Sequence, residues 1–293
     1  MERISFYDQI ASNKRKSVFL MVMVFIVLLA LGYVISMAFE PGYFFFIMAI
    51  SIIFSISYLL ISYYNSDRIA LASVNAKPAS KEQHRQYYST VEGLAIASGL
   101  PMPKLYVMEN EQINAFASGR DPQHAVICVT TGALNRLNKQ ELEGVLSHEL
   151  SHIANFDIRF ITLVAVMVGM ISIISQMFLR SMWFRGNDRE GKGNAIFILI
   201  GLVLAIIAPI VVQLVQLAVS RKREFTADAT AVKFTRYPPG LINALKKIKN
   251  DRPMRVNKAV APLFMSDPFR QKMSNLLSTH PPIDERIKVL SGM

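Results

Sequence analysis

The sequence predicts an α-helical membrane protein that carries an α+β domain interrupted by its own membrane segments. Hydrophobic residues make up 52% of the chain and charged residues only 18%, whereas soluble domains usually carry about 25% charged residues. The deficit is confined to four windows without Asp, Glu, Lys or Arg, and the rest of the chain is charged like an ordinary globular domain. These observations exclude a purely soluble or disordered chain.

The four uncharged windows are residues 17–39, 43–64, 160–179 and 195–220. An α-helix rises ~1.5 Å per residue, so each window is long enough to cross the ~30 Å hydrocarbon core of a bilayer. A buried core helix, the alternative, is rarely apolar over such a length. We therefore expect about four transmembrane helices in two hairpins, the second of which could instead be re-entrant.

The windows divide the chain into four segments. We expect an N-terminal transmembrane hairpin over residues 1–64 and a second transmembrane or re-entrant hairpin over residues 158–220. Residues 65–157 and 221–293 would form the two parts of one cytoplasmic domain, because four basic residues precede the first window and none lies in the loop after it. The chain would thus be a multi-pass protein of the cell membrane with this domain on the cytoplasmic side.

The net charge of +11 lies mostly after residue 220. No zinc finger, helix-turn-helix or aromatic RNA-binding pattern accompanies it, so we do not expect a nucleic-acid partner. Arg221, Lys222 and Arg223 directly follow the fourth window, at the level where anionic lipid headgroups lie. We therefore expect the basic segment to face an anionic lipid bilayer.

Short elements are expected in the first part of the cytoplasmic domain. Residues 65–83 are polar and typical of a linker, and residues 83–97 have helical spacing before a Gly/Pro-rich stop. Residues 104–108, 113–118 and 125–130 are rich in β-formers and separated by turn residues, so they should be strands.

Helices are expected in the rest of this domain. Asn138 with Glu141 three residues later is the capping-box pattern that opens a helix. After the fourth window we expect a helix over residues 224–235, a break at Pro238-Pro239-Gly240, a helix to about residue 249, and a closing helix that begins at Pro281-Pro282.

The capped helix contains the sequence His148-Glu149-Leu150-Ser151-His152. Four residues of ~100° each bring the two histidines to nearly the same helix face, ~6 Å apart along the axis, so both imidazoles can bind one metal ion. Glu149 follows the first histidine, where its carboxylate can reach a water molecule on that metal. The alternative of two surface histidines on an amphipathic helix is disfavoured because the pattern rarely arises by chance. The motif predicts a catalytic metal site with Glu149 as its base.

A catalytic zinc site needs a third protein ligand and an open position. Glu224 lies four residues after the fourth window and His152 eight residues before the third, so a hairpin would bring both to one membrane face. We predict Glu224 as the third ligand, with an ion pair to Arg221 or Arg223 as the alternative. Asp228, one turn later, is either a hydrogen-bond partner of a ligating imidazole or an exposed helix charge.

These residues resemble the HtpX-type membrane zinc metalloproteases, gluzincins related to the CAAX prenyl endopeptidases. The resemblance covers nearly the whole chain and implies a zincin-like metalloprotease domain with one Zn²⁺ per chain, held by His148, His152 and Glu224. Thr226 stands where many relatives have His or Tyr between the Glu and the Asp. This difference does not affect the zinc chemistry that the resemblance implies. The matching motifs are His148-Glu149-x-x-His152 with Asn155 and Asp157, Arg-Glu224-Phe-x-Ala-Asp228, and Thr279-His280-Pro281-Pro282 through Arg286.

The resemblance also implies a substrate and a role. Asn114, Ala115 and Phe116 would lie on an edge strand that binds an extended protein substrate through backbone hydrogen bonds. The expected function is hydrolysis of misfolded or damaged membrane proteins. Processing of lipidated or secreted peptides, or a non-catalytic membrane protein stapled by zinc, are the alternatives.

Two further residues near the C-terminus are candidates. His280 is expected to donate a hydrogen bond to the oxyanion of the reaction, with a helix-capping role as an equal alternative. For Arg286 we favour an ion pair with Asp284 or Glu285 over an oxyanion role.

Overall fold

A computed structural model describes residues 6–37, 40–165, 221–254, 256, 258–266, 268 and 281–293. The fourth apolar window, most of the third, and His280 lie outside these residues. The expectations for the second hairpin and for the role of His280 therefore remain predictions.

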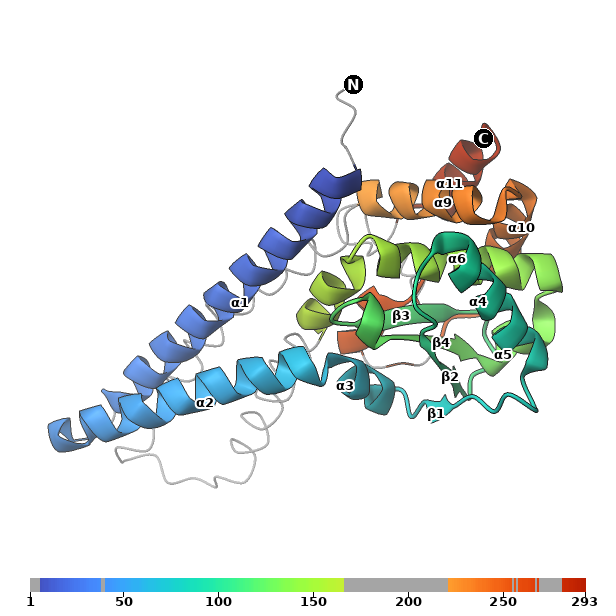
Figure 1. The fold of residues 1–293 in the computed structure, drawn as a ribbon. Coiled ribbons are helices and arrows are strands. Elements are labelled where there is room, and N and C mark those ends of the chain that lie inside the picture. The colour runs from blue at the N-terminus through green and yellow to red at the C-terminus, as the bar shows by residue number, and fades with distance from the viewer. Residues whose placement is uncertain are drawn as a thin grey trace.

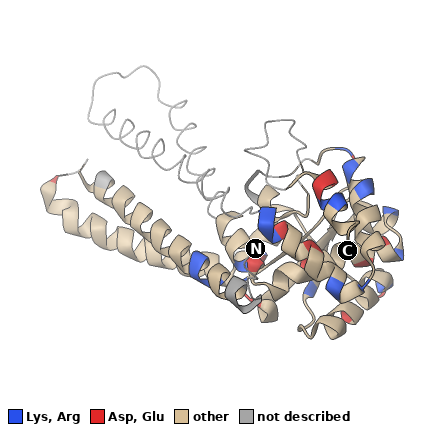
Figure 2. Cartoon of the chain, turned by 90° about the horizontal axis from the view of Figure 1, so that it is seen from above, with Lys and Arg blue, Asp and Glu red and all other residues tan. Residues whose placement is uncertain are grey.

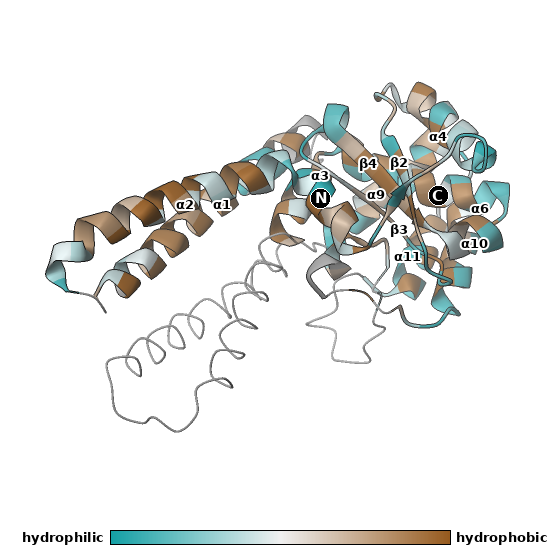
Figure 3. Ribbon diagram, turned by 90° about the horizontal axis from the view of Figure 1, so that it is seen from below, coloured by the Kyte–Doolittle hydropathy of each residue, from teal (hydrophilic) through white to brown (hydrophobic). Residues whose placement is uncertain are grey.

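The N-terminal hairpin consists of α1 (Phe6–Ser36), a 3₁₀ turn (Pro41–Tyr43) and α2 (Phe44–Tyr64). The two helices form an arm that projects from the rest of the molecule, and they are close together at its tip and diverge toward the globular part (Figure 1). Within the described part of the chain, Ile10–Tyr33 and Pro41–Tyr64 are the two stretches long and apolar enough to cross a membrane. Their residues are predominantly hydrophobic (Figure 3), and one of them, Phe45, is 83% exposed. The first predicted hairpin is thus present as two long apolar helices.

The globular part contains a four-stranded sheet of order β1-β2-β4-β3. Strands β2 (Lys104–Met108) and β4 (Ala125–Thr130) are parallel, and β3 (Ala115–Gly119) runs antiparallel to β4 at the edge. Strands 104–108 and 125–130 are confirmed, and β3 begins two residues later than predicted. The predicted linker is wrong in part, because it contains α3 (Ser66–Ser73) and β1 (Lys77–Pro78).

Helix α6 (Lys139–Ala154) lies across one face of the sheet and is the centre of the globular part (Figure 1). Its capping box is confirmed: Asn138 Oδ1 accepts from the Glu141 amide at 2.9 Å, and Glu141 accepts from the Asn138 amide at 2.8 Å. The apolar side chains of α6 at positions 142, 145, 146, 150 and 153 are completely buried. Every residue of α6 from position 144 to position 153 is buried, so the histidine motif lies on an enclosed segment of this helix.

Helices α4 (Arg85–Ser98), α9 (Arg221–Thr235) and α10 (Pro238–Lys249) pack on α6, and α11 (Ile283–Leu290) packs on α9 and α10. Helix α10 begins at Pro238 itself, because proline fits the first turn of a helix. A short helix α5 (Thr131–Arg136) follows β4. Charged side chains gather on this globular part, whereas the helical arm is largely uncharged (Figure 2).

Candidate metalloprotease active site

His148 and His152 lie on the side of α6 that packs against α9. Both are buried, with exposures of 0% and 7%, and their rings are nearly perpendicular with centroids 4.8 Å apart. The two Nε2 atoms face each other at 3.2 Å. The one-turn spacing of the motif therefore brings the two Nε2 atoms close enough to bind the same metal ion, as expected for residues on one face of a helix.

Glu224 reaches the same point from the first turn of α9. Its Oε2 lies 3.6 Å from His148 Nε2 and its Oε1 lies 3.7 Å from His152 Nε2. The ligand atoms of all three side chains lie within 4.8 Å of one another, and all three residues are buried. The structure thus joins residues that are more than 70 positions apart in the sequence.

The separations fit a tetrahedral zinc ion. With zinc–nitrogen distances of ~2.0–2.1 Å and tetrahedral angles, two ligand nitrogens lie ~3.3 Å apart, close to the observed 3.2 Å. Two histidines and one carboxylate are also the donor set of many catalytic zinc sites, which keep the fourth position open. The residues present therefore fit the metal that the motif predicts.

A carboxylate backs each histidine on its other ring nitrogen. Asp228 Oδ1 lies 2.9 Å from His148 Nδ1, and Asp157 Oδ2 lies 3.1 Å from His152 Nδ1. Such partners hold the ring orientation and leave Nε2 available to a metal. Asp228 is completely buried rather than exposed. Asp157 was not predicted to touch His152, although an acidic residue just beyond the end of the motif helix is a usable signal.

Arg286 differs from the sequence-based expectation. Its side chain is buried and forms a two-pronged ion pair with Asp228, at 2.9 Å and 2.7 Å. The favoured pairing with Asp284 or Glu285 is wrong: Asp284 is exposed and pairs with Lys249 at 2.6 Å. Adjacent residues point to different faces of a helix, and Arg286 occupies the buried face of α11.

The buried carboxylates of the site favour a positively charged group beside them. Burial and Arg286 act to lower the pKa of His148, but hydrogen bonds to Asp228 and Glu224 outweigh them and raise it to about 9. Burial would raise the pKa of Asp228, yet Arg286 and His148 hold it at about 2. A bound cation would satisfy the same carboxylates, which is a second point of fit to a metal.

Glu149 is completely enclosed next to the first histidine. Burial raises the pKa of its carboxyl group, against the lowering effect of the two histidines. One oxygen, Oε1, is buried and has no hydrogen-bond partner among the described residues, and the backbone of Ala117 on β3 also acts to lower the pKa of this carboxyl group. A carboxylate with a raised pKa and a free oxygen is suited to accept a proton from water.

The predicted substrate residues lie at the edge strand, but the chain itself covers part of that edge. The carbonyl of Ala115 accepts from the amide of Met265 at 2.9 Å, and Asn114 Nδ2 donates to the carbonyl of Ser266 at 3.2 Å. The ring of Phe116 is completely buried against Phe264, with centroids 5.2 Å apart. The sequence contained no signal that residues 264–266 would return to this strand.

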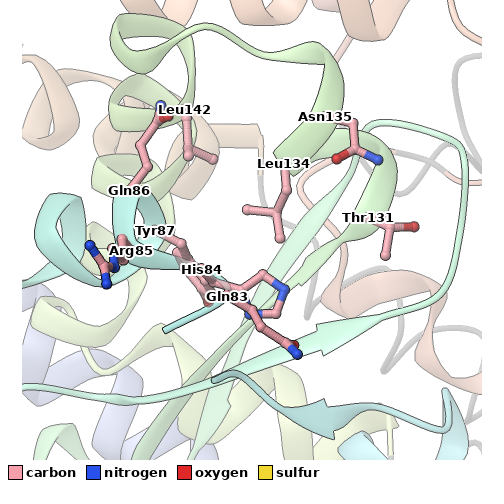
Figure 4. Close-up of a pocket in the computed structure, with 9 residues that line it drawn as sticks. All are labelled: Gln83, His84, Arg85, Gln86, Tyr87, Thr131, Leu134, Asn135 and Leu142. Carbon is pink, nitrogen blue, oxygen red and sulfur yellow. The ribbon is translucent and has the colours of Figure 1, made fainter. Parts of the chain in front are cut away.

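A separate cavity of about 300 Å³ lies at the start of α4 (Figure 4). Its lining comes from residues 83 and 84 just before α4, from the first turn of α4, from α5, and from Leu142 on α6. His84 lines it, so this histidine lies apart from the histidine pair of the motif.

Comparison with known proteins identifies the family. The profile of peptidase family M48 matches residues 81–293. Proteins named "Protease HtpX homolog" from Thermoanaerobacter pseudethanolicus and Caldanaerobacter subterraneus subsp. tengcongensis are 44% and 46% identical, each over 100% of this chain and 99% of its own. The crystal structure of S. mikatae Ste24p matches with a TM-score of 0.48 and 20% identity, over 96% of this chain and 65% of that protein. The chain thus belongs to peptidase family M48 and to its HtpX-type group.

Proposed function

We propose that this protein is an integral membrane, zinc-dependent endopeptidase whose active site lies on the cytoplasmic side of the cell membrane. The observation that carries the proposal is the buried cluster of His148, His152 and Glu224, whose ligand atoms lie within 4.8 Å of one another. Membership of a peptidase family and the two apolar N-terminal helices support the same conclusion.

Zinc at this cluster would supply a Lewis acid that lowers the pKa of water to roughly 7 and polarises the scissile carbonyl group. Glu149 would take the proton from the attacking water on Oε1, the oxygen without a protein partner. It would then deliver that proton to the nitrogen of the leaving amine, so one carboxyl group serves as base and then as acid. Its raised pKa favours the first step, because the conjugate base of a weaker acid accepts a proton more readily.

Asp228 and Asp157 would keep His148 and His152 oriented through their Nδ1 atoms. Arg286 would fix Asp228 and balance the charge of the buried carboxylates, since its Nη1 also lies 3.5 Å from Glu224 Oε2. The raised pKa of Arg286, caused chiefly by Asp228 against the effect of burial, keeps this guanidinium charged.

We place the substrate along β3, with Asn114, Ala115 and Phe116 as its binding residues. Phe116 would contribute only backbone, because its side chain is completely buried. The carbonyl of Ala115 already accepts from Met265, so a substrate strand would displace residues 264–266 or pair beyond them. Binding through backbone hydrogen bonds depends little on the side chains of the substrate. Such loose selectivity suits the removal of misfolded or damaged membrane proteins.

The test is zinc content and cleavage of a model membrane protein by the wild-type chain and by Glu149→Gln. We expect the variant to retain one zinc per chain and to lose cleavage. Glu143→Gln, a change of the same type on the same helix but outside the cluster, should retain both. Full cleavage by Glu149→Gln, or a wild-type chain that binds no zinc, would overturn the proposal.

A further inference from the structure

The turn that follows α6 carries a carboxylate of the metal site. Residues 157–165 form the next helix, and between the two helices Phe156 adopts a left-handed φ of 58°. This conformation is uncommon for residues other than glycine and needs support from its surroundings. Asp157 directly follows Phe156 and accepts from His152. The orientation of the second histidine therefore depends on how this turn is held.

The first membrane helix supplies that support. Asn13 on α1 is only 2% exposed, and its Nδ2 donates to the carbonyl of Asn155 at 3.0 Å and to Oδ1 of Asp157 at 2.6 Å. Lys14 lies over the ring of Phe156, with Nζ 4.4 Å from the centroid. A side-chain amide has two donor hydrogens, and these two contacts use both of them on the turn.

The contact is part of a larger interface between α1 and the helix after the turn. About two turns further along α1, Leu20 begins a buried row that continues through Val24 and Leu28. This row packs against Phe160, Leu163 and Val164. The depth at which α1 lies along that helix therefore sets where Asn13 meets Asp157.

The two oxygens of Asp157 have different partners. Oδ1 accepts from Asn13 and Oδ2 faces His152. We infer that Asn13 is a positioning residue of the metal site, which links the placement of the first membrane helix to the orientation of a metal-binding histidine. The inference deepens the proposed zinc site and rests on it. Asp157 also interacts with the positive charges of Lys16 and Arg223.

The inference is tested on the full-length chain in detergent by zinc affinity, measured in competition with a chelator. Loss of a direct partner of a ligating histidine usually costs ~10–100-fold in affinity. Since Asn13 acts one bond further out, we expect Asn13→Ala to weaken zinc about three- to tenfold. The Co²⁺-substituted protein should show an altered visible spectrum, because the ring of His152 is reoriented.

Ser17→Ala is the matched control. Ser17 lies one turn further along α1, is also buried, and among the described residues its hydroxyl group donates only to the carbonyl of Asn13. We expect its zinc affinity and its cobalt spectrum to equal those of the wild type.

The double variant separates positioning from general packing. In an Asp157→Ala background, Asn13→Ala should cause no further loss of zinc affinity, because its route to the metal is gone. The same fold-loss in both backgrounds, or unchanged affinity in Asn13→Ala, would overturn the inference. If Asn13→Ala does not fold, Asn13→Ser repeats the test with a polar side chain too short to reach Asp157. A wild-type chain that binds no zinc would instead overturn the proposed function.

Discussion

Arg286 and Asp228 form a buried two-pronged ion pair behind the histidine cluster, with Nε–Oδ2 at 2.9 Å and Nη2–Oδ1 at 2.7 Å. Oδ1 of the same aspartate lies 2.9 Å from His148 Nδ1, and Arg286 also donates to the carbonyl of Met265 at 3.1 Å. One guanidinium thus connects α9, α6, α11 and the segment that covers β3. This arrangement explains why an arginine can be 1% exposed.

Arg286→Ala should destabilise the protein by about 3–5 kcal/mol, because it leaves the buried carboxylate of Asp228 without its partner. Arg286→Lys should also destabilise, since an ammonium cannot reproduce the two-pronged geometry. Thermal or denaturant unfolding in detergent measures both effects. Lys249→Ala, which breaks an exposed pair with Asp284, should change stability by less than about 1 kcal/mol. Equal effects at positions 286 and 249 would contradict the importance of the buried pair.

Asp251 should make stability depend on acid pH. Its carboxylate accepts from the Ile113 amide at 2.6 Å and from Arg136 at 2.9 Å, and these contacts lower its pKa although burial opposes them. A folded-state pKa below the unfolded value of ~3.9 means that the stabilisation is present above pH ~4 and is lost as the pH falls through the folded-state value.

Asp251→Asn should therefore lower the Tm at pH 7, and the difference from the wild type should shrink below pH ~4. Melting curves at pH 7 and at pH 3 provide the measurement. The exposed Asp284→Asn serves as the control with little effect at either pH. A loss that stays constant with pH would show that Asp251 acts through packing rather than through its charge.

Metal removal should destabilise the fold, because the proposed ligands come from two helices. A ligand present at 100 times its Kd stabilises the folded state by ~2.7 kcal/mol. Addition of a chelator should lower the Tm of the wild type, and excess zinc should restore it. His148→Ala should show neither response. A wild-type Tm that is insensitive to both chelator and zinc would contradict a zinc site shared by α6 and α9.

Gly144 should not tolerate alanine. A Cβ atom at this position would lie 2.5 Å from the backbone nitrogen of Leu241, where α6 and α10 approach closely. We expect a loss of about 1–3 kcal/mol from overpacking, against the gain of ~1 kcal/mol that alanine gives in a helix. Gly93 on α4 has nothing within 4 Å of such an atom, so Gly93→Ala should be stabilising. The opposite signs of the two changes in Tm are the result to look for.

Several elements could be predicted because their signals are local. The capping box at Asn138 opens α6 as expected, and strands β2 and β4 have the predicted bounds. Helix α3 was missed because its two buried apolar residues, Ala70 and Leu71, gain their burial from packing on a distant cluster with Met108 and Phe116. Its own composition is nearly balanced between polar and apolar residues and resembles a linker.

The sequence by itself determined the apolar first hairpin, the one-turn spacing of His148 and His152, and the acidic residue between them, because helix periodicity and composition depend only on neighbours. Only the tertiary structure decided the partners of these groups. Asp228 meets His148, Asp157 meets His152, Arg286 meets Asp228 and Asn13 meets Asp157. Most of these pairs are tens of residues apart or more in the chain, and their meeting depends on how α1, α9 and α11 pack on α6. No local sequence pattern encodes such packing. The packing buries charged residues beside the motifs and makes them partners of the histidines.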